Sequence, residues 1–254
     1  MDRSEREIAL HKIIYKDYIE RRDNPVCRLV DRFWYGEMTR EIVTHVKKQR
    51  IKIIDLGAGT CLFFETIKDN QNIDYTGVDS SQEMLNYAGS IYGSFSNFHS
   101  FVKNLDGDFS MREQYDVYAM RSLVHHLEHK DEFLKMLISS IPSGALLVIS
   151  EPNRNFLTHT LRELLKKIKK GHFDQEHYDL STQYFLEHFK RDDISFLGMK
   201  YFGYFSYPFS FPYILKLPIP EWCVRLFIPI DRLLSRLPIM RRLSWHVIYI
   251  AQKK

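Results

Sequence analysis

Short apolar runs alternate with amphipathic stretches through the middle of the chain, and this alternation predicts its fold. Branched apolar runs are typical of buried strands, whereas apolar residues that recur every three or four positions are typical of helices. Five strands are expected, in residues 51–57, 74–81, 98–104, 115–122 and 144–152. Helices are expected between them, in residues 61–68, 81–93 and 129–141. Strands that alternate with helices in this way predict βαβ units and a parallel sheet of the α/β class.

The two ends of the chain have different patterns. Amphipathic helices are predicted for residues 3–22 and 26–48, separated by a break at Asn24-Pro25. After residue 151 we expect two helices, an aromatic strand and a closing strand, in residues 156–170, 180–191, 194–207 and 244–254. We therefore expect a helical N-terminal cap, a main domain and an insert between the last two strands, formed by residues 1–48, 49–206 with 244–254, and 207–243.

The first predicted strand ends in an acid and a glycine turn, "DLGAG", that suit a nucleotide-like ligand. Gly57 and Gly59 expose backbone N–H groups and let a ligand approach without interference from a Cβ atom. Asp55 can accept a hydrogen bond from an amino group. Asp79 ends the second strand, and its carboxylate can accept from both hydroxyls of a ribose. In parallel sheets such ligands bind at the carboxyl ends of the strands.

Three interpretations of this turn are compatible with the residues. The dinucleotide fingerprint GxGxxG requires a third glycine beside the pyrophosphate, and Leu62 stands at that position. A nucleotide-like ligand without a phosphate, such as S-adenosylmethionine, tolerates a bulky residue there. A tight turn that binds nothing is the third interpretation.

Several motifs in sequence order resemble the class I S-adenosylmethionine-dependent methyltransferases, in particular the broad subgroup of single-domain enzymes that act on small molecules. "IIDLGAGTC" resembles their first motif, "GVDSSQEML" their acidic loop, "YDVYAMRSLVHHLEH" their fourth strand and "ALLVISEPN" their fifth. "SWHVIYIAQKK" resembles their last strand. The resemblance implies a Rossmann-like, doubly wound sheet of seven strands with an antiparallel last strand, and S-adenosylmethionine as the cofactor.

The resemblance also implies cofactor-binding residues. They are, in chain order, Asp55, Gly57, Ala58, Gly59, Asp79, Ser80, Met84, Asn104, Leu105, Met120 and Arg121. The glycine turn would contact the methionine part of the cofactor, whose amino group Asp55 would hold. Met120 and Arg121 would line the same end.

The remaining implied residues would hold the adenosine. Asp79 would bind the ribose hydroxyls, and Ser80 and Met84 would flank the nucleoside. Asn104 and Leu105 stand where the family has an acid and an apolar residue beside the adenine. Because the acid is absent at that position, either the Asn104 amide or the nearby Asp106 would serve.

Methyl transfer from a sulfonium is an in-line displacement, so the protein must mainly place the acceptor and exclude water. A base is needed only when the acceptor loses a proton. His125 and His126 follow the fourth strand, and either histidine can act as a general base near neutral pH. The alternative is that both histidines only pack beneath the cofactor. His125 and His129 have the spacing of helical metal ligands, but no obvious further ligand completes the set, so we expect no metal site.

The insert is rich in apolar residues and is interrupted by prolines. It also carries Trp222 and several arginines, so it fits a lid for a hydrophobic acceptor or a surface that contacts a membrane interface. The predicted helix at 156–170 is basic and amphipathic and also fits an anionic membrane surface. A dimer interface or a small additional core are the alternatives for the insert, and the oligomeric state stays open.

The net charge of +4 is mild, and the basic residues are interleaved with aliphatic ones, so nucleic acid is not expected as a partner. Three widely separated cysteines favour a reducing, cytoplasmic compartment. The first residues lack the apolar core of a signal peptide, and no apolar run reaches the length of a membrane span. We expect a cytoplasmic location, with peripheral contact at the inner membrane face as a further expectation.

These features together predict S-adenosylmethionine-dependent methyl transfer to a small or lipid-linked hydrophobic acceptor, with oxygen favoured as the methylated atom. A membrane-associated binding protein that keeps the fold without catalysis is the main alternative. An NAD-dependent oxidoreductase is disfavoured by Leu62 and by the closing strand.

Overall fold

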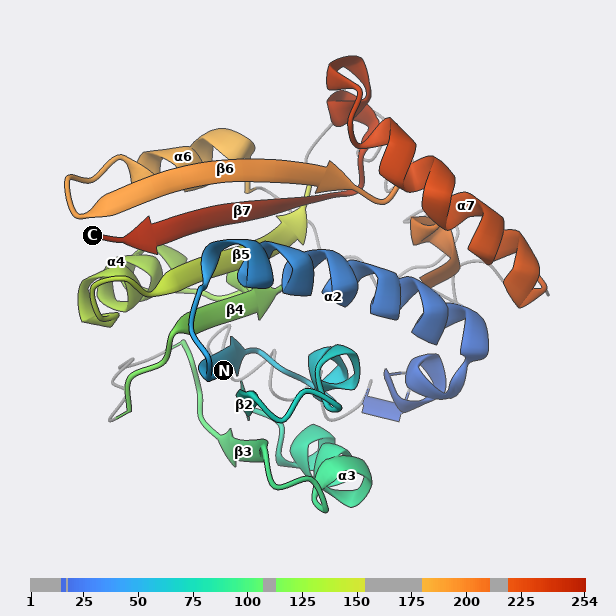
Figure 1. The fold of residues 1–254 in the computed structure, drawn as a ribbon, viewed down its shortest axis with the longest axis horizontal. Coiled ribbons are helices and arrows are strands. Elements are labelled where there is room, and N and C mark those ends of the chain that lie inside the picture. The colour runs from blue at the N-terminus through green and yellow to red at the C-terminus, as the bar shows by residue number, and fades with distance from the viewer. Residues whose placement is uncertain (1–14, 17, 107–112, 154–179, 211–218) are drawn as a thin grey trace.

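The chain folds around one seven-stranded sheet, which a computed structural model describes for residues 15–16, 18–106, 113–153, 180–210 and 219–254. The strands are β1 (Ile51–Leu56), β2 (Ile73–Asp79), β3 (Phe98–Val102), β4 (Val117–Arg121), β5 (Leu146–Pro152), β6 (Ile194–Phe202) and β7 (His246–Lys253). Their order across the sheet is β3-β2-β1-β4-β5-β7-β6 (Figure 1). The first five strands are parallel, and β7 lies between β5 and β6 and is antiparallel to both. The predicted α/β class and the antiparallel last strand are confirmed.

The strand order reverses beside β1, because the chain continues from β1 to β2 and β3 on one side and then crosses to β4 and β5 on the other. This arrangement creates a switch point at the carboxyl ends of β1 and β4, where open α/β sheets bind their ligands. The topology therefore points to the same edge of the sheet as the glycine turn does.

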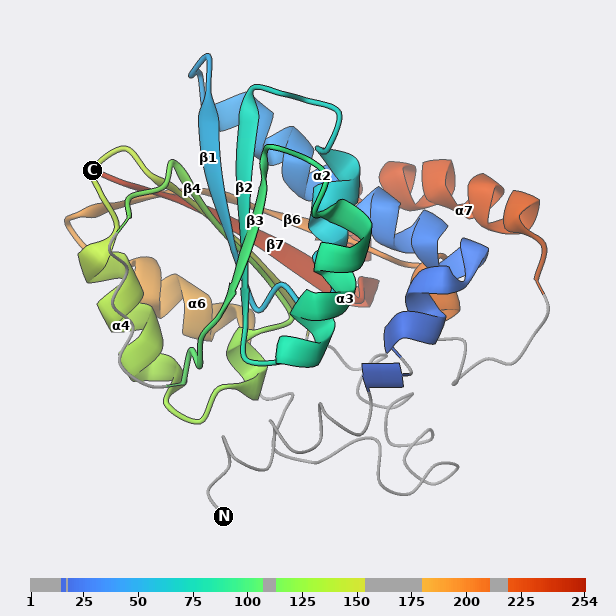
Figure 2. The same cartoon turned by 90° about the horizontal axis from the view of Figure 1, so that it is seen from below.

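Helices cover both faces of the sheet. Among the α-helices in the described residues are α2 (Pro25–His45), α3 (Gln82–Tyr92), α4 (Lys130–Ser140), α6 (Thr182–Phe189) and α7 (Glu221–Leu234). Shorter 3₁₀ segments are η1 (Leu62–Thr66), η2 (Val124–His126), η4 (Tyr207–Ser210) and η5 (Pro238–Leu243). In Figure 2, α2, α3 and α7 lie on one side of the sheet and α4 and α6 on the other.

Alternation along the strands produces two separate cores. Side chains of a strand point to opposite faces in turn, so Ile53 packs on the α2 side while Ile54 packs on the α4 side. Both residues are fully buried, as is typical of parallel strands that are covered on both faces. A sheet held between two cores gives its carboxyl edge a rigid support.

Local signals in the sequence account for the helix starts. The side chain of Asn24 accepts hydrogen bonds from the N–H groups of Val26 and Cys27, and Pro25 stands in the first turn of α2. Ser81 caps α3 in the same way, by accepting from the N–H of Met84. The two helices therefore begin close to where the sequence predicts.

The predicted helix at 61–68 is only partly correct, because the segment forms η1, a 3₁₀ helix of five residues. Cys61 precedes η1 in a left-handed conformation with φ of 54°, so the chain leaves the glycine turn through a second tight bend. Phe63 and Phe64 are both fully buried, and their packing anchors a segment that is too short for a regular α-helix.

Three predicted features lie wholly or partly outside the described residues. They are the basic helix at 156–170, most of the helix at 3–22 and positions 211–218 of the insert. The division of the chain into a cap, a main domain and an insert stays a prediction.

Candidate functional site

The glycine turn at the end of β1 has a backbone that only glycine adopts readily. Gly57 and Gly59 have φ values of 72° and 53°. A Cβ atom on Gly57 would lie 2.8 Å from Cδ1 of Leu123, so any other residue at position 57 would have to displace this side chain of the adjacent β4–η2 loop. The N–H groups of Gly57 and Ala58 donate to the carbonyl oxygen of Val78, which fastens the turn to the end of β2.

Asp79 lies at the end of β2 beside this turn. One carboxylate oxygen accepts from the N–H of Gly59 at 2.7 Å, and the other accepts from the N–H of Ser81 at 2.9 Å. Each oxygen has a further lone pair, so the carboxylate can still accept two more hydrogen bonds. Because Asp79 is buried and fixed from two sides, the geometry fits a pair of neighbouring hydroxyls, as a ribose provides.

Two further predicted residues lie next to Asp79. The Met84 side chain is buried, and its Sδ lies 3.6 Å from the place that a Cβ on Gly59 would occupy. Ser80 is half-buried between Asp79 and the Ser81 cap of α3. The glycine turn, the Asp79 carboxylate and the Met84 thioether therefore come together at one point of the carboxyl edge of the sheet, which we call the rim.

Asp55, at the end of β1, is buried beneath the turn. The hydroxyl of Tyr75 donates to its Oδ2 at 2.7 Å. Burial raises the pKa of Asp55 to about 7, and the neighbouring charge of Asp79 adds to the rise. A cationic amino group beside Asp55 would favour its ionised form, which is the chemistry predicted for this residue.

Arg121, at the end of β4, is held by α2. Its Nη2 donates to Oδ1 of Asp31 at 2.7 Å. The guanidinium lies 4.4 Å and 4.6 Å from the ring centres of Trp34 and Tyr35. The structure therefore adds Asp31 and two aromatic rings to this end of the rim, where sequence reasoning named Arg121 with Met120.

Met120 lies on the opposite side of the sheet from Arg121. Its side chain is fully buried in the core beneath α4. This placement follows from strand alternation, which sends successive side chains to opposite faces.

The segment after β3 contains Asn104 and Asp106, the two alternatives that the sequence leaves for the adenine. Both oxygens of Asp106 accept backbone N–H groups at 2.8 Å, from Glu128 and His129 at the start of α4. Asn104 is exposed and accepts from the N–H of Asp106 at 3.0 Å. Leu105 is buried between them. Asp106 thus braces α4, while the exposed Asn104 lies two positions before it, and both stay candidates for the adenine edge.

His125 forms a pair with Glu151 across the ends of β4 and β5. Nδ1 of His125 lies 2.5 Å from Oε2 of Glu151, while Oε1 accepts from the N–H groups of Leu123 and Val124. Burial raises the pKa of Glu151 to about 8, although these backbone donors and the nearby His126 favour the ionised form. The imidazole ring centres of His125 and His126 are 4.1 Å apart.

Glu151 and Asn153 follow one another closely at the end of β5, on the carboxyl edge of the sheet. Both side chains have partners within the chain: Glu151 pairs with His125, and the Asn153 amide donates to Ser244 and to the carbonyl oxygen of Arg241. The sequence held one signal for the pairing of Glu151 with His125. Glu151 lies near the end of the fifth predicted strand, and two histidines follow the fourth. Among the described residues, no group of three or more His, Cys, Asp or Glu side chains is placed to hold a metal ion.

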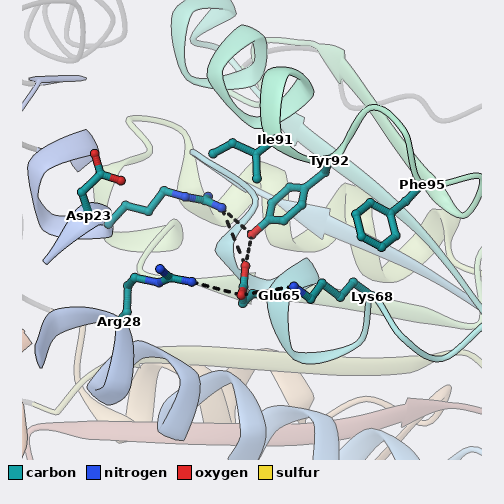
Figure 3. A pocket seen from close by; sticks show the side chains of 8 residues that line it. Asp23, Arg28, Glu65, Lys68, Ile91, Tyr92 and Phe95 are labelled. Atoms are coloured by element: carbon teal, nitrogen blue, oxygen red, sulfur yellow. Dashed lines mark hydrogen bonds and ion pairs between the residues drawn. The ribbon is translucent and has the colours of Figure 1, made fainter. Parts of the chain in front are cut away.

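A polar cavity of about 220 Å³ lies beside the glycine-turn region (Figure 3). Its lining residues are Arg22, Asp23, Arg28, Glu65, Lys68, Ile91, Tyr92 and Phe95. Figure 3 shows Arg28, Lys68 and the Tyr92 hydroxyl directed at the Glu65 carboxylate. Burial alone would raise the pKa of Glu65, but hydrogen bonds from Tyr92 and Arg32 and the charge of Lys68 lower it to about 2.

Arg22 connects this cluster to the glycine turn. It is buried, and its Nη1 donates to the carbonyl oxygen of Thr60 at 2.7 Å, while Nη2 donates to the Tyr92 hydroxyl. The segment before α2 therefore supports the loop that follows Gly59. Sequence reasoning missed this contribution, because nothing in the local pattern around Arg22 indicates a partner so far along the chain.

The fold and the site define a class of protein: an α/β protein with a glycine turn and a fixed carboxylate at the carboxyl ends of its parallel strands. A family model described as "Methyltransferase domain" matches residues 18–191. The chain belongs to this family, and the predicted class of S-adenosylmethionine-dependent methyltransferase is confirmed. No curated protein sequence matches the chain significantly.

Solved structures show the same fold at low sequence identity. The plantazolicin methyltransferase BpumL, in complex with SAH, has a TM-score of 0.61 and 17% identity, covering 96% of this chain and 90% of that one. Coclaurine N-methyltransferase, bound to N-methylheliamine and SAH, has a TM-score of 0.59 and 15% identity, with 86% and 71% covered. The [4+2]-cyclase SpnF has a TM-score of 0.58 and 12% identity, with 85% and 80% covered. Since one of these neighbours is named a cyclase, the fold alone does not identify the acceptor or the reaction at it.

Proposed function

We propose that the protein transfers a methyl group from S-adenosylmethionine to a hydrophobic acceptor, small or lipid-linked, at an oxygen atom. The observation that carries the cofactor site is the Asp79 carboxylate, which is fixed by two backbone N–H groups beside a turn of two glycines. Such a rim fits a nucleoside without phosphates.

Each end of the cofactor has its own residues in this proposal. Asp79 accepts from the ribose hydroxyls, Met84 and Ser80 flank the nucleoside, and Asn104 with Leu105 lies at the adenine. Gly57, Ala58 and Gly59 contact the methionine part, and Asp55 accepts from its amino group. Arg121 forms the outer wall of this end, where α2 meets β4.

When bound, the cofactor supplies an activated methyl group. The chain's own task is to exclude water, to orient the acceptor and to take the proton that a hydroxyl loses as the new O–C bond forms. His125 suits this task because Glu151 fixes Nδ1, which directs the base function to Nε2. Glu151 must be ionised for this role, since a protonated Glu151 would itself donate to Nδ1 and leave the proton on Nε2.

The hydrophobic acceptor is proposed from the position of the insert. Phe202 at the end of β6 pairs with His246 at the start of β7, and His246 also pairs with Pro152 at the end of β5. Residues 203–245 therefore leave and re-enter the sheet at the edge where β5 ends. A segment rooted at this edge and rich in apolar residues supports a role in covering the acceptor and in reaching a membrane from the cytoplasm.

Calorimetry tests the cofactor, and turnover tests the reaction. The protein should bind S-adenosylmethionine and S-adenosylhomocysteine, and NAD should produce no heat of binding. Incubation with a lipid extract and isotopically labelled cofactor should then yield a product heavier by one labelled methyl group. Binding of S-adenosylhomocysteine without any methylated product from lipid or small-molecule extracts would favour a binding protein that keeps the fold.

A further inference from the structure

Helix α7 has apolar residues on two opposite faces, and among the described residues only one of these faces packs on the rest of the chain. Val224 and Asp231 are fully buried, and Ile228 packs partly against the α2 core. The guanidinium of Arg232 bonds Glu37 of α2 at 3.0 Å and lies 5.3 Å from the ring centre of Phe33. In Figure 1, α7 lies alongside α2 at the periphery of the molecule.

Asp231 fixes the rotation of α7 about its axis. Its carboxylate accepts from the N–H groups of Tyr204, Phe205 and Ser206, and the Ser206 hydroxyl donates to it as well. Turning the helix would leave this buried charge without its donors, which is costly. The outward face of α7 is therefore set by the fold.

That outward face is apolar. Trp222, Leu226, Ile230 and Leu233 are 62%, 57%, 42% and 60% exposed. Their spacing of four, four and three residues places them in one stripe along the helix. Leu237 and Ile239 follow the helix and are 42% and 76% exposed. These six residues are the α7 outer surface.

Positive charge accompanies this surface. Residues 219–245 contain five arginines and two acids. Of the two acids, Asp231 is buried and Glu221 is paired with Arg225 at 3.1 Å. Arg236 is exposed and follows the last turn of α7, three positions after Leu233. Arg241 is exposed in η5, with its guanidinium 5.9 Å from the ring centre of Tyr201.

From these contacts we propose that the α7 outer surface docks on an anionic lipid bilayer, with the helix parallel to the membrane plane. Exposed leucines and a tryptophan suit the boundary between headgroups and acyl chains, and the arginines suit anionic headgroups. A second copy of the chain would complement the leucines but would bring arginines against arginines. The bilayer complements both features.

Docking on the surface is distinct from crossing the membrane. Within the part of the chain that the structure describes, no helix has the length and apolar content that a bilayer span requires. Helix α7 has 14 residues, with Pro229 inside it. The membrane contact does not depend on methyl transfer, whereas its use in presenting a lipid-linked acceptor rests on the proposed function.

Flotation of the full chain with lipid vesicles tests this docking. The protein should float with vesicles of phosphatidylcholine mixed with an equal amount of phosphatidylglycerol, and weakly or not at all with phosphatidylcholine alone. The double variant Leu226→Glu/Leu233→Glu should bind the anionic vesicles at least about 100-fold more weakly. Arg236→Gln/Arg241→Gln should weaken binding about 30-fold, since each basic residue near an anionic surface contributes about one factor of five.

Val43→Glu is the matched control, because Val43 is also an exposed apolar residue on a helix and lies outside the α7 outer surface. It should float as the unaltered protein does. Each variant should bind S-adenosylhomocysteine with unchanged affinity, which shows that it is folded and separates this test from that of the proposed function. No flotation of the unaltered protein, equal flotation of the leucine variant, or a dimer that Leu226→Glu dissociates would each overturn the proposal.

Discussion

The carboxyl edge of the sheet and the α7 outer surface differ in which side chains they bury. The edge buries carboxylates, whereas the α7 outer surface exposes leucines. At the edge, the carboxylates of Asp79 and Glu151 are buried and held by backbone N–H groups. On α7, Leu226 and Leu233 are more than half exposed. Burying a carboxylate and exposing a leucine both cost free energy, so each arrangement indicates a binding role.

This difference shows how far the binding groups of each region are already oriented before a ligand binds. The edge is pre-organised, because its charged groups are already oriented by the chain and lose little freedom when a ligand binds. The α7 outer surface is oriented by Asp231 but has no apolar partner among the described residues. The edge therefore fits a small polar ligand, and α7 fits a broad apolar one.

Removing the Asp79 carboxylate should have the largest effect. We expect Asp79→Ala to weaken S-adenosylhomocysteine binding at least about 100-fold, since two hydrogen bonds to a charged group contribute about 3 kcal/mol or more. Isothermal titration calorimetry measures the change. Asp74→Ala is the control, because Asp74 lies near the opposite end of β2 and pairs with Arg50. Unchanged affinity in Asp79→Ala would refute the ribose assignment.

Changing the His125–Glu151 pair should have the next largest effect, on kcat. We expect His125→Gln to lower kcat about 100-fold at unchanged KM, in line with the usual contribution of a general base. The pKa of Glu151 is raised to about 8, so its carboxylate form increases as the pH rises, and kcat should rise with pH and level off above 8. Glu151→Gln should abolish this rise.

A substitution of His126 tests whether His125, rather than His126, is the general base. His126→Gln should retain the pH profile if His125 alone accepts the proton. A loss of melting temperature in His125→Gln at unaltered kcat would show that the pair only packs beneath the cofactor.

Loosening the support of the glycine turn should have a smaller effect. Arg22→Met removes the hydrogen bond to the Thr60 carbonyl, and we expect about tenfold weaker binding of S-adenosylhomocysteine. Arg28→Met is the control, because Arg22 and Arg28 both form ion pairs with Glu65, at 3.9 Å and 3.2 Å, and only Arg22 has a bond to Thr60. Equal losses in both variants would mean that the ion cluster, rather than the Thr60 contact, supports the turn.

Shortening a side chain on the α7 outer surface should have the smallest effect on folding. Leu226→Ala should change the free energy of unfolding by no more than about 0.5 kcal/mol, whereas Val224→Ala, on the buried face, should cost about 2 kcal/mol. Chemical denaturation of both variants measures this contrast. A large loss in Leu226→Ala would show that the outer face belongs to the core.

Much of the fold could be predicted from the sequence, because its signals are local. Alternating apolar runs predicted the parallel strands, and the closing strand of the resemblance proved to lie between β5 and β6. The segment 61–68 differed because burial of Phe63 and Phe64 and the bend at Cys61 decided its geometry. The spacing of apolar residues along the sequence does not reveal such packing.

The candidate site divides in the same manner. Gly57, Gly59 and Asp79 could be named from the sequence. A turn with positive φ favours glycine, and an acid that directly follows an apolar run is visible in the sequence. The partners could not. His125 and Glu151 are 26 positions apart, and Asp31 and Arg121 are 90 positions apart.

The sequence by itself determined the order of strands and helices, the glycine turn and the acid beside it, because each depends on neighbouring residues. Only the tertiary structure decided that Asp106 braces α4, that Glu151 orients His125, and which face of α7 meets the solvent. These outcomes depend on which residues, far apart in the sequence, the fold brings within hydrogen-bonding distance of one another. A local sequence pattern does not predict such pairs.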